Sequence, residues 1–310
     1  MFEESDAFGP SYGDFTLISS DSVRFHIDRS LLGYVSGFFK DIFSLTPTRP
    51  FGIEFTEDSL TVKETSPVLD TFLRHIDPNR TTPRIEAETI GPLLEAARFY
   101  RVLSIITWFK NEVLVRRANF RTKIDGPCFL DEHPLLVLAL TYKFGLEELA
   151  RTAISQLIIC DAALWKKSID VDIDGRLVLY CRQLRDERIE LYSSLVESLT
   201  QHELSNTKNI KDSDRETCMS CTVARAQWTY KMLNSVFRRP EWSACFEAYS
   251  EEIEPYDCDH EISWPDIKQK TMTKWRNVNK PEKLEEKIPH TPTWLDNQLR
   301  DNAIFTPERM

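Results

Sequence analysis

Glycine, histidine and recognisable catalytic motifs are scarce in this sequence. It has nine glycines in 310 residues, which is few for an enzyme that builds its active site from loops. It has no Gly-rich phosphate loop, no Gly-x-Ser-x-Gly elbow and no His-Glu-x-x-His helix. The six histidines are scattered, and only His260 has cysteine neighbours. We therefore expect a protein that is not an enzyme.

Long apolar runs and an excess of basic charge are also absent. The longest apolar run, residues 135–140, is far shorter than the roughly 18–20 residues that span a bilayer. Residues 1–11 carry Glu3, Glu4 and Asp6 and lack the apolar segment of a secretory signal. The net charge of −10 argues against a nucleic-acid-binding surface. We expect an intracellular protein, cytoplasmic or nuclear, that binds neither nucleic acid nor membrane. Its seven cysteines are then reduced thiols or metal ligands rather than disulfides.

The most informative segment is residues 14–43. Apolar and polar residues alternate in 15–17 and again in 23–27, on either side of a polar turn at 19–22, which predicts a β-hairpin. The next segment changes to helical spacing and predicts a helix over residues 29–45. The apolar residues on its broad face are Leu31, Leu32, Val35, Phe38, Phe39, Ile42 and Phe43.

This hairpin and helix resemble the opening of a BTB/POZ domain. The family pattern is roughly Asp-hydrophobic-Thr-Leu, then Phe-x-hydrophobic-His, then Leu-x-x-x-Ser-x-x-Phe, and the matching segments here are 14–17, 25–28 and 32–39. Residues 93–102 are similar to the later family pattern Leu-Leu-x-Ala-Ala-x-x-Tyr-x-Val, so the resemblance covers residues 14–115 in order. It implies an α+β fold, with an N-terminal hairpin and a small sheet flanked by helices. It also implies a function in protein–protein interaction.

Beyond residue 125 the pattern becomes wholly helical. Antiparallel helices are predicted at 135–142 and 146–157, with Gly145 as a left-handed cap between them, and a long helix follows from Arg176 to about Thr200. This all-α part resembles the BACK-like extension that follows many BTB domains, and the general organisation resembles fungal BTB proteins. The expected parts are a flexible leader at 1–12, a BTB/POZ domain at 13–120, a BACK-like helical region at 126–204, a linker at 205–217, a small Cys-bearing helical module at 218–260 and an extended, partly disordered tail at 261–310.

The Cys-bearing module is predicted to contain two helices. The first carries apolar residues from Val223 to Phe237 and ends at Arg239-Pro240. A second, short helix runs through Trp242, Cys245, Phe246 and Tyr249. Two helices of this size bury little core, so a further source of stability is expected.

Structural zinc is the candidate for that stability. Cys218-x-x-Cys221 and Cys258-x-His260 supply four soft ligands that can close a tetrahedral site. Metal binding would then contribute folding free energy to the module. Two alternatives stay open, namely reduced and unconnected thiols, and a redox or disulfide role. The cysteines at 128, 160 and 181 lie in apolar surroundings and are expected in the core.

The BTB resemblance implies a homodimer that buries Leu31, Val35 or Phe38. Asp28 stands where the family has His, near this interface. Its alternative role is that of a helix N-cap that accepts backbone N–H groups. Asp14 either lies at the charged centre that the resemblance implies or simply begins a strand.

Two partner classes compete under the BTB resemblance. One is a cullin-type ubiquitin ligase, for which the chain would be an adaptor. The other is transcriptional corepressors, which would make the chain a transcriptional regulator. A zinc-stabilised scaffold, oligomerised by its BTB domain, is the alternative function.

Overall fold

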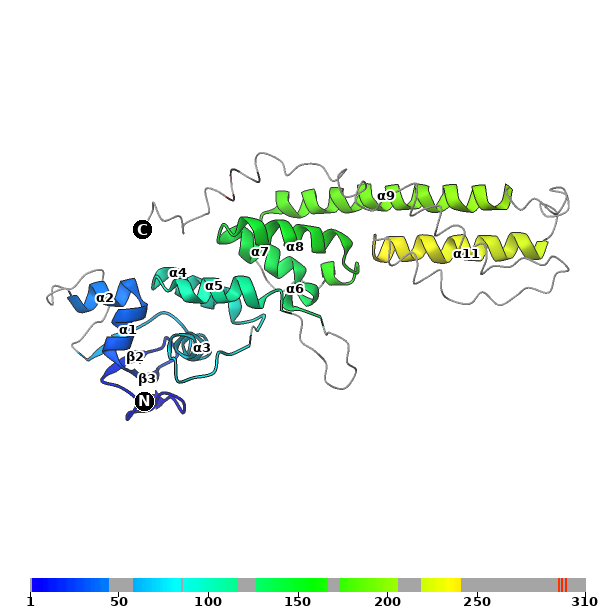
Figure 1. Ribbon diagram of the computed structural model, residues 1–310. Coiled ribbons are helices and arrows are strands. Elements are labelled where there is room, and N and C mark those ends of the chain that lie inside the picture. Colours follow the sequence, from blue (N-terminus) through cyan, green and yellow to red (C-terminus); the bar gives the residue numbers. More distant parts are fainter. Residues whose placement is uncertain are drawn as a thin grey trace. The chain divides into compact units, whose positions relative to one another are not determined.

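The chain divides into two compact units, Met1–Leu130 and Asp131–Met310. The structure is a computed structural model that describes residues 2–44, 58–84, 86–115, 127–166, 173–205 and 219–240, together with residues 295, 297 and 299. The first unit combines a four-stranded sheet with helices, and the described part of the second unit is helical (Figure 1). The α+β class predicted from the sequence is therefore confirmed.

The predicted hairpin forms the centre of the sheet. Strands β2 (Phe15–Ile18) and β3 (Val23–Ile27) are antiparallel, with Phe15 opposite Ile27 and Leu17 opposite Phe25. These four side chains lie on one face, because alternate residues of a strand point the same way, and all four are buried. Gly13 precedes β2 and lies so close to the chain at Ile27 that an added Cβ would come within 2.1 Å of its carbonyl carbon.

Two outer strands complete the sheet in the order β1-β3-β2-β4. β1 (Glu3–Glu4) pairs in parallel with β3, and β4 (Ser59–Thr61) pairs in parallel with β2. Neither was predicted, because strands of two and three residues are too short to show an alternating pattern. Residues 51–55, Phe-Gly-Ile-Glu-Phe, are a further predicted strand, and they lie outside the described residues.

The helices of the first unit contribute apolar faces to its buried core. They are α1 (Arg29–Val35), α2 (Gly37–Ser44), α3 (Ser66–Ile76), α4 (Ile90–Phe99) and α5 (Leu103–Glu112). The pair Ser66-Pro67 predicts a helix start with Ser66 as the N-cap. α3 does begin here, with Pro67 in the first turn, but its N-cap is Thr65 and Ser66 is its first residue. Its first N–H group is bound by Asp21 rather than by a cap within the helix, since the Ser66 N–H donates to Asp21 Oδ1 at 2.9 Å. A hydrogen bond from the Ser19 side chain, together with the contacts with Ser66, lowers the pKa of Asp21.

The predicted helix over residues 29–45 is interrupted at Ser36, which separates α1 from α2. Ser36 has an extended backbone, and its buried hydroxyl donates to the Tyr100 carbonyl at 2.6 Å. The hydroxyl oxygen also accepts the Phe39 N–H, so it caps the start of α2. Serine favours such local hydrogen bonds over a continuous helix, and this is the physical reason for the break.

The second unit contains α7 (Pro134–Lys143), α8 (Glu147–Ile159), the 3₁₀ turn η1 (Leu164–Lys166), α9 (Gly175–Ser205) and α11 (Met219–Arg238). A short helix, α6 (Phe129–Glu132), lies at the boundary between the units. α7 and α8 pack as the predicted pair, and Gly145 between them has φ of 64°, as expected for a left-handed cap. α9 and α11 lie side by side (Figure 1). Within the described residues, no helix is both long enough and apolar enough to cross a membrane.

Candidate interaction surface

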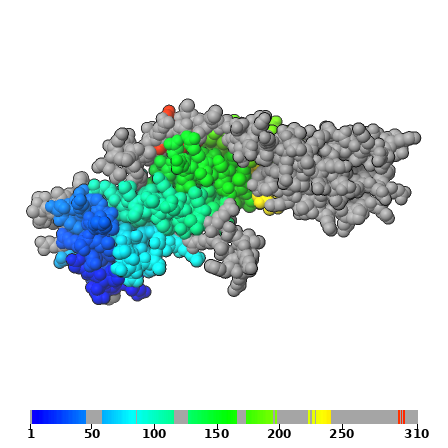
Figure 2. Space-filling view, in the orientation of Figure 1, coloured from blue at the N-terminus to red at the C-terminus, as the bar shows by residue number. Residues whose placement is uncertain are grey.

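The exposed face of α1 is the clearest candidate for binding another protein. Leu31, Tyr34 and Val35 share this face at helical spacing, and we call these three residues the α1 face. The Tyr34 side chain is 89% exposed, the most exposed large apolar residue among those described, while Leu31 and Val35 are half-buried. The first 44 residues, drawn in dark blue, lie at the visible surface of their unit (Figure 2). Covering this tyrosine and the two aliphatic residues beside it would stabilise a complex, because apolar surface would be removed from water.

Phe38, the first aromatic residue of α2, belongs to an aromatic cluster rather than to an open surface. Its ring centroid lies 5.0 Å from that of Phe99 and 5.3 Å from those of Phe39 and Tyr100. Phe99 is 45% exposed, and the Lys63 ammonium lies 4.9 Å from its ring centroid. Phe38 is therefore half-buried by its own unit, and only part of its ring is open to a partner.

Asp14, and not Asp28, caps α1. Asp28 occupies the N-cap position but makes no side-chain cap hydrogen bond, whereas Asp14 Oδ1 accepts the Arg29 N–H at 2.8 Å. The predicted cap at Asp28 is therefore correct in position and wrong in its hydrogen bond. Both carboxylates are exposed, so Asp14 is not at a buried charged centre. A cap supplied by Asp14, which lies just before β2 and 15 residues before Arg29, cannot be identified from residues local to the helix.

The exposed side of α1 carries no charged side chain. Arg29 is the only charged residue of the helix, and its guanidinium lies 4.5 Å from the ring centroid of Phe43 and 5.9 Å from that of Phe15. Such cation–π contacts hold the charge against the body of the unit. Two copies of this face can approach one another without like-charge repulsion.

A buried hydrogen bond joins Tyr100, a member of the aromatic cluster around Phe38, to Glu64. The Tyr100 hydroxyl donates to Glu64 Oε2, and both side chains are almost fully buried. Burial and the Glu64 carboxylate raise the pKa of Tyr100. The Tyr100 carbonyl accepts a hydrogen bond from the Ser36 hydroxyl, so Tyr100 links the segment after β4, the break between α1 and α2, and the end of α4.

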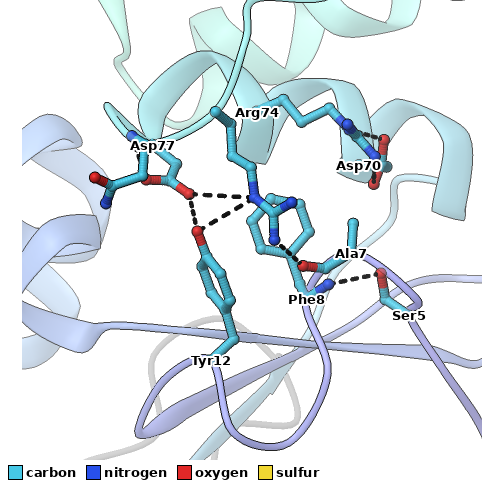
Figure 3. Close-up of polar contacts among 9 residues, drawn as sticks. Ser5, Ala7, Phe8, Tyr12, Asp70, Arg74 and Asp77 are labelled. Atoms are coloured by element: carbon cyan, nitrogen blue, oxygen red, sulfur yellow. Dashed lines mark hydrogen bonds and ion pairs between the residues drawn. The ribbon is translucent and has the colours of Figure 1, made fainter.

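A second polar cluster fixes the N-terminal arm, residues 5–12, to the end of α3. The Tyr12 hydroxyl donates to Asp77 (Figure 3). The Arg80 guanidinium donates to the Ala7 carbonyl and lies 4.9 Å from the Tyr12 ring centroid. Phe8 is fully buried and meets Tyr12 edge-on at 5.1 Å. The hydrogen bond to Asp77 raises the pKa of Tyr12. The sequence suggested a flexible leader at 1–12, but Phe8 and Tyr12 supply apolar burial that packs residues 5–12 against the unit.

The zinc prediction rests on residues that the structure does not describe. Cys218, Cys258 and His260 lie outside the described residues, and of Cys221 only the backbone is described. Among the residues that are described, no group of three or more His, Cys, Asp or Glu side chains could hold a metal ion.

The described cysteines are buried, as predicted. They are Cys128, Cys160 and Cys181, and none forms a disulfide. Burial raises the pKa of Cys160 to about 11 and that of Cys181 to about 12. Both thiols are therefore protonated at neutral pH and are poor nucleophiles.

Tyr34 and Phe99 were not predicted as interface residues. Tyr34 lies three residues after Leu31 and one before Val35, so helical periodicity could have placed it beside them. The predicted apolar face is divided by the break in the helix at Ser36. This break depends on the hydrogen bond from Ser36 to Tyr100, 64 residues away.

Comparison with models of known protein families gives no match, and comparison with curated proteins gives none either. The functional argument for this chain therefore depends on its own residues.

Proposed function

We propose that the first unit is a BTB/POZ-like protein-interaction domain through which the chain forms a homodimer. The observation that carries the proposal is the α1 face, with Tyr34 almost fully exposed between two half-buried aliphatic residues. The order of hairpin, interrupted helix and α3–α5 supports the same proposal, because it follows the order of segments in the family resemblance.

A second copy of the chain is the occupant that best fits the α1 face. In a two-fold symmetric interface each patch meets its own copy, so it must be self-complementary. An uncharged apolar face meets this requirement. Exposed Asp28, at the start of α1, would lie at the rim of the interface, where a carboxylate can stay hydrated.

Light scattering coupled to size exclusion tests the dimer. We expect twice the chain mass of 36.2 kDa at micromolar concentration, and a monomer for Tyr34→Glu, because the carboxylate would be buried in the interface. Since Tyr34 is so exposed, this variant should keep its helical circular dichroism. Lys110→Glu changes an exposed residue of α5 and is the matched control. A monomeric wild-type chain, or a Tyr34→Glu variant that still dimerises, contradicts the proposal.

The more specific proposal is an adaptor for a cullin-type ubiquitin ligase. It rests on the BTB resemblance alone, as does the competing role with a transcriptional corepressor. Recovery of a cullin with the affinity-purified wild-type chain would support the adaptor role. Recovery of corepressors without a cullin would favour the transcriptional role.

The zinc-stabilised scaffold stays a prediction from the four ligands at Cys218, Cys221, Cys258 and His260. We expect about one equivalent of zinc by elemental analysis after purification without chelator, and loss of that metal in Cys218→Ser. Less than about a tenth of an equivalent in the wild-type chain would contradict the site.

A further inference from the structure

Helix α11 has two apolar faces, and the described residues form a buried cluster on only one of them. Met232 and Val236 are buried in a cluster with Tyr192 and Val196 of α9. A second set of residues follows the exposed side of α11 at steps of four, three and four residues, the spacing of a helix–helix seam. This set, which we call the α11 stripe, consists of Ala226, Tyr230, Leu233 and Phe237.

The α11 stripe is exposed over most of its length. Tyr230 is 70% exposed and Phe237 is 56% exposed, while Leu233 lies at the edge of the cluster with α9. Exposed aromatic residues at this spacing fit a second helix that presents apolar residues at the same intervals. The candidate occupant must therefore carry a matching pattern.

Residues 241–254 of the same chain carry that pattern. They lie outside the described residues, but their sequence predicts a helix that begins beside Pro240 and Glu241 and stops at Pro255. Its apolar residues also follow steps of four, three and four: Trp242, Phe246, Tyr249 and Ile253.

The two patterns are in register for an antiparallel hairpin. In such a hairpin, residues that face one another are equally far from the turn. Every member of the α11 stripe has a partner placed symmetrically about the Arg239–Pro240 peptide bond: Phe237 with Trp242, Leu233 with Phe246, Tyr230 with Tyr249, and Ala226 with Ile253. A turn at this point is expected, because proline cannot continue α11 and antiparallel helices are joined by short connections.

The end of α11 is already fixed at the place where this turn would begin. The Pro240 carbonyl accepts a hydrogen bond from Arg188 Nε of α9 at 2.6 Å, and the Arg239 N–H donates to the Ser235 carbonyl at 2.9 Å. Pro240 itself is buried. The chain therefore leaves α11 from a defined point beside the stripe.

Charge favours this occupant over a second copy of α11. α11 carries three basic side chains, Arg225, Lys231 and Arg238, and no acidic one. Residues 241–254 carry five glutamates and no lysine or arginine. Opposite charges on neighbouring helices attract, whereas two copies of α11 would repel.

We propose that the α11 stripe is the docking surface for residues 241–254 of the same chain, which fold back as an antiparallel helix with opposite charge. The second unit then contains a three-helix arrangement of α9, α11 and this segment. This inference is independent of the proposed dimer, because it concerns a different unit and a contact within one chain.

Hydrogen–deuterium exchange of the full chain tests the docking. We expect the amides of residues 245–254 to exchange at least about tenfold more slowly than in an unstructured reference peptide. Tyr230→Glu combined with Phe237→Glu should remove this protection, because both carboxylates would face the acidic segment. Lys110→Glu, at an exposed position of α5 in the first unit, changes the charge by the same two units and is the matched control. Retained protection in α9 would show that the double variant is folded.

Two results would overturn the proposal in this experiment. One is exchange of residues 245–254 at the reference rate in the wild-type chain, and the other is unchanged protection in the double variant. Protection that increases with protein concentration over an about fiftyfold range would also overturn it, because it would mean docking onto a second copy.

A synthetic peptide of residues 241–254 provides an independent measurement. A chain with Phe246→Glu and Tyr249→Glu should have an empty stripe and bind the peptide, whereas the wild-type chain should bind it at least about tenfold more weakly. Equal binding to both chains would contradict occupation by the chain's own segment.

Discussion

His75 is a partly buried histidine whose Nε2 has no hydrogen-bond partner among the described residues. Its ring centroid lies 4.0 Å from that of Trp108, so α3 and α5 hold the imidazole against an aromatic surface. Burial lowers the pKa of His75 from 6.5 to about 4. The side chain is therefore neutral at physiological pH, and its role is that of a packing residue.

Acid should destabilise the first unit through His75. Because the folded state binds the proton more weakly than the unfolded chain, the contribution of His75 to stability is complete above pH 6.5. It is lost as the pH falls from 6.5 to about 4. Between pH 7 and pH 4 we expect the free energy of unfolding of the wild-type chain to fall by about 2 kcal/mol more than that of His75→Phe. Urea denaturation at both pH values measures this difference, and parallel pH profiles would contradict it.

Individual carboxylates also show the limit of sequence reasoning at the residue scale. The pattern predicted an N-cap at Asp28, the nearest acidic residue before α1. In the structure Asp14 accepts the capping hydrogen bond from the Arg29 N–H, and the Asp28 side chain makes no cap hydrogen bond. Similarly, Ser66 does not cap α3. Its N–H and hydroxyl groups instead donate hydrogen bonds to the Asp21 carboxylate. Local sequence shows where a cap is needed, but the donor–acceptor pair depends on which strand lies beside the helix.

At the scale of elements, α1 depends on a cap from Asp14, the residue just before β2. Removing the Asp14 carboxylate in Asp14→Ala leaves the Arg29 N–H without its partner, and we expect a loss of about 1 kcal/mol in the free energy of unfolding. Asp28→Ala should cost much less, since Asp28 makes no cap hydrogen bond. Chemical denaturation of the two single variants measures both values. Equal losses, or a larger loss for Asp28→Ala, would show that Asp28 supplies the cap in solution.

Helices with strong periodicity and clear end signals were predicted well. α3, α7 and α8 lie where apolar spacing, Pro67 and Gly145 placed them. The interruption between α1 and α2 was missed although Gly37 follows Ser36, because a single glycine weakens a helix without fixing where it ends. Its cause is a hydrogen bond to Tyr100, which no local pattern records. The outer strands β1 and β4 were missed because they exist only through pairing with the hairpin.

At the scale of the whole molecule, one buried arginine joins three helices of the second unit. Arg185 of α9 is 6% exposed and donates to the carbonyls of Ile158 and Cys160 at the end of α8, at 3.0 and 2.8 Å. It also donates to the Arg238 carbonyl at the end of α11, at 2.7 Å. Carbonyl groups at helix C-termini lack partners within the helix and carry partial negative charge. A planar guanidinium can bind two such ends at once, and burial lowers its pKa without neutralising it.

Loss of Arg185 should therefore release α11 from α8. We expect Arg185→Met to lower the free energy of unfolding of the second unit by about 3 kcal/mol, because several buried carbonyls lose their donor. Arg185→Lys should be intermediate, since an ammonium group cannot span both helix ends. Arg182→Met, at an exposed position of the same helix, should be nearly neutral. Chemical denaturation and amide exchange of α11 measure the effect, and equal costs at positions 182 and 185 would contradict it.

The sequence alone determined the local character of this protein. Alternation, helical periodicity and residues such as Pro67 and Gly145 place the hairpin and most described helices, because these signals act over a few residues. Only the tertiary structure decided which side chains meet across the chain: Asp14 with the start of α1, Ser36 with Tyr100, and Arg185 with the ends of α8 and α11. It also decided that Tyr34 is exposed while Phe38 is half-covered. Such pairs join residues 15 to 64 positions apart, and their formation depends on how whole elements pack rather than on any neighbouring sequence.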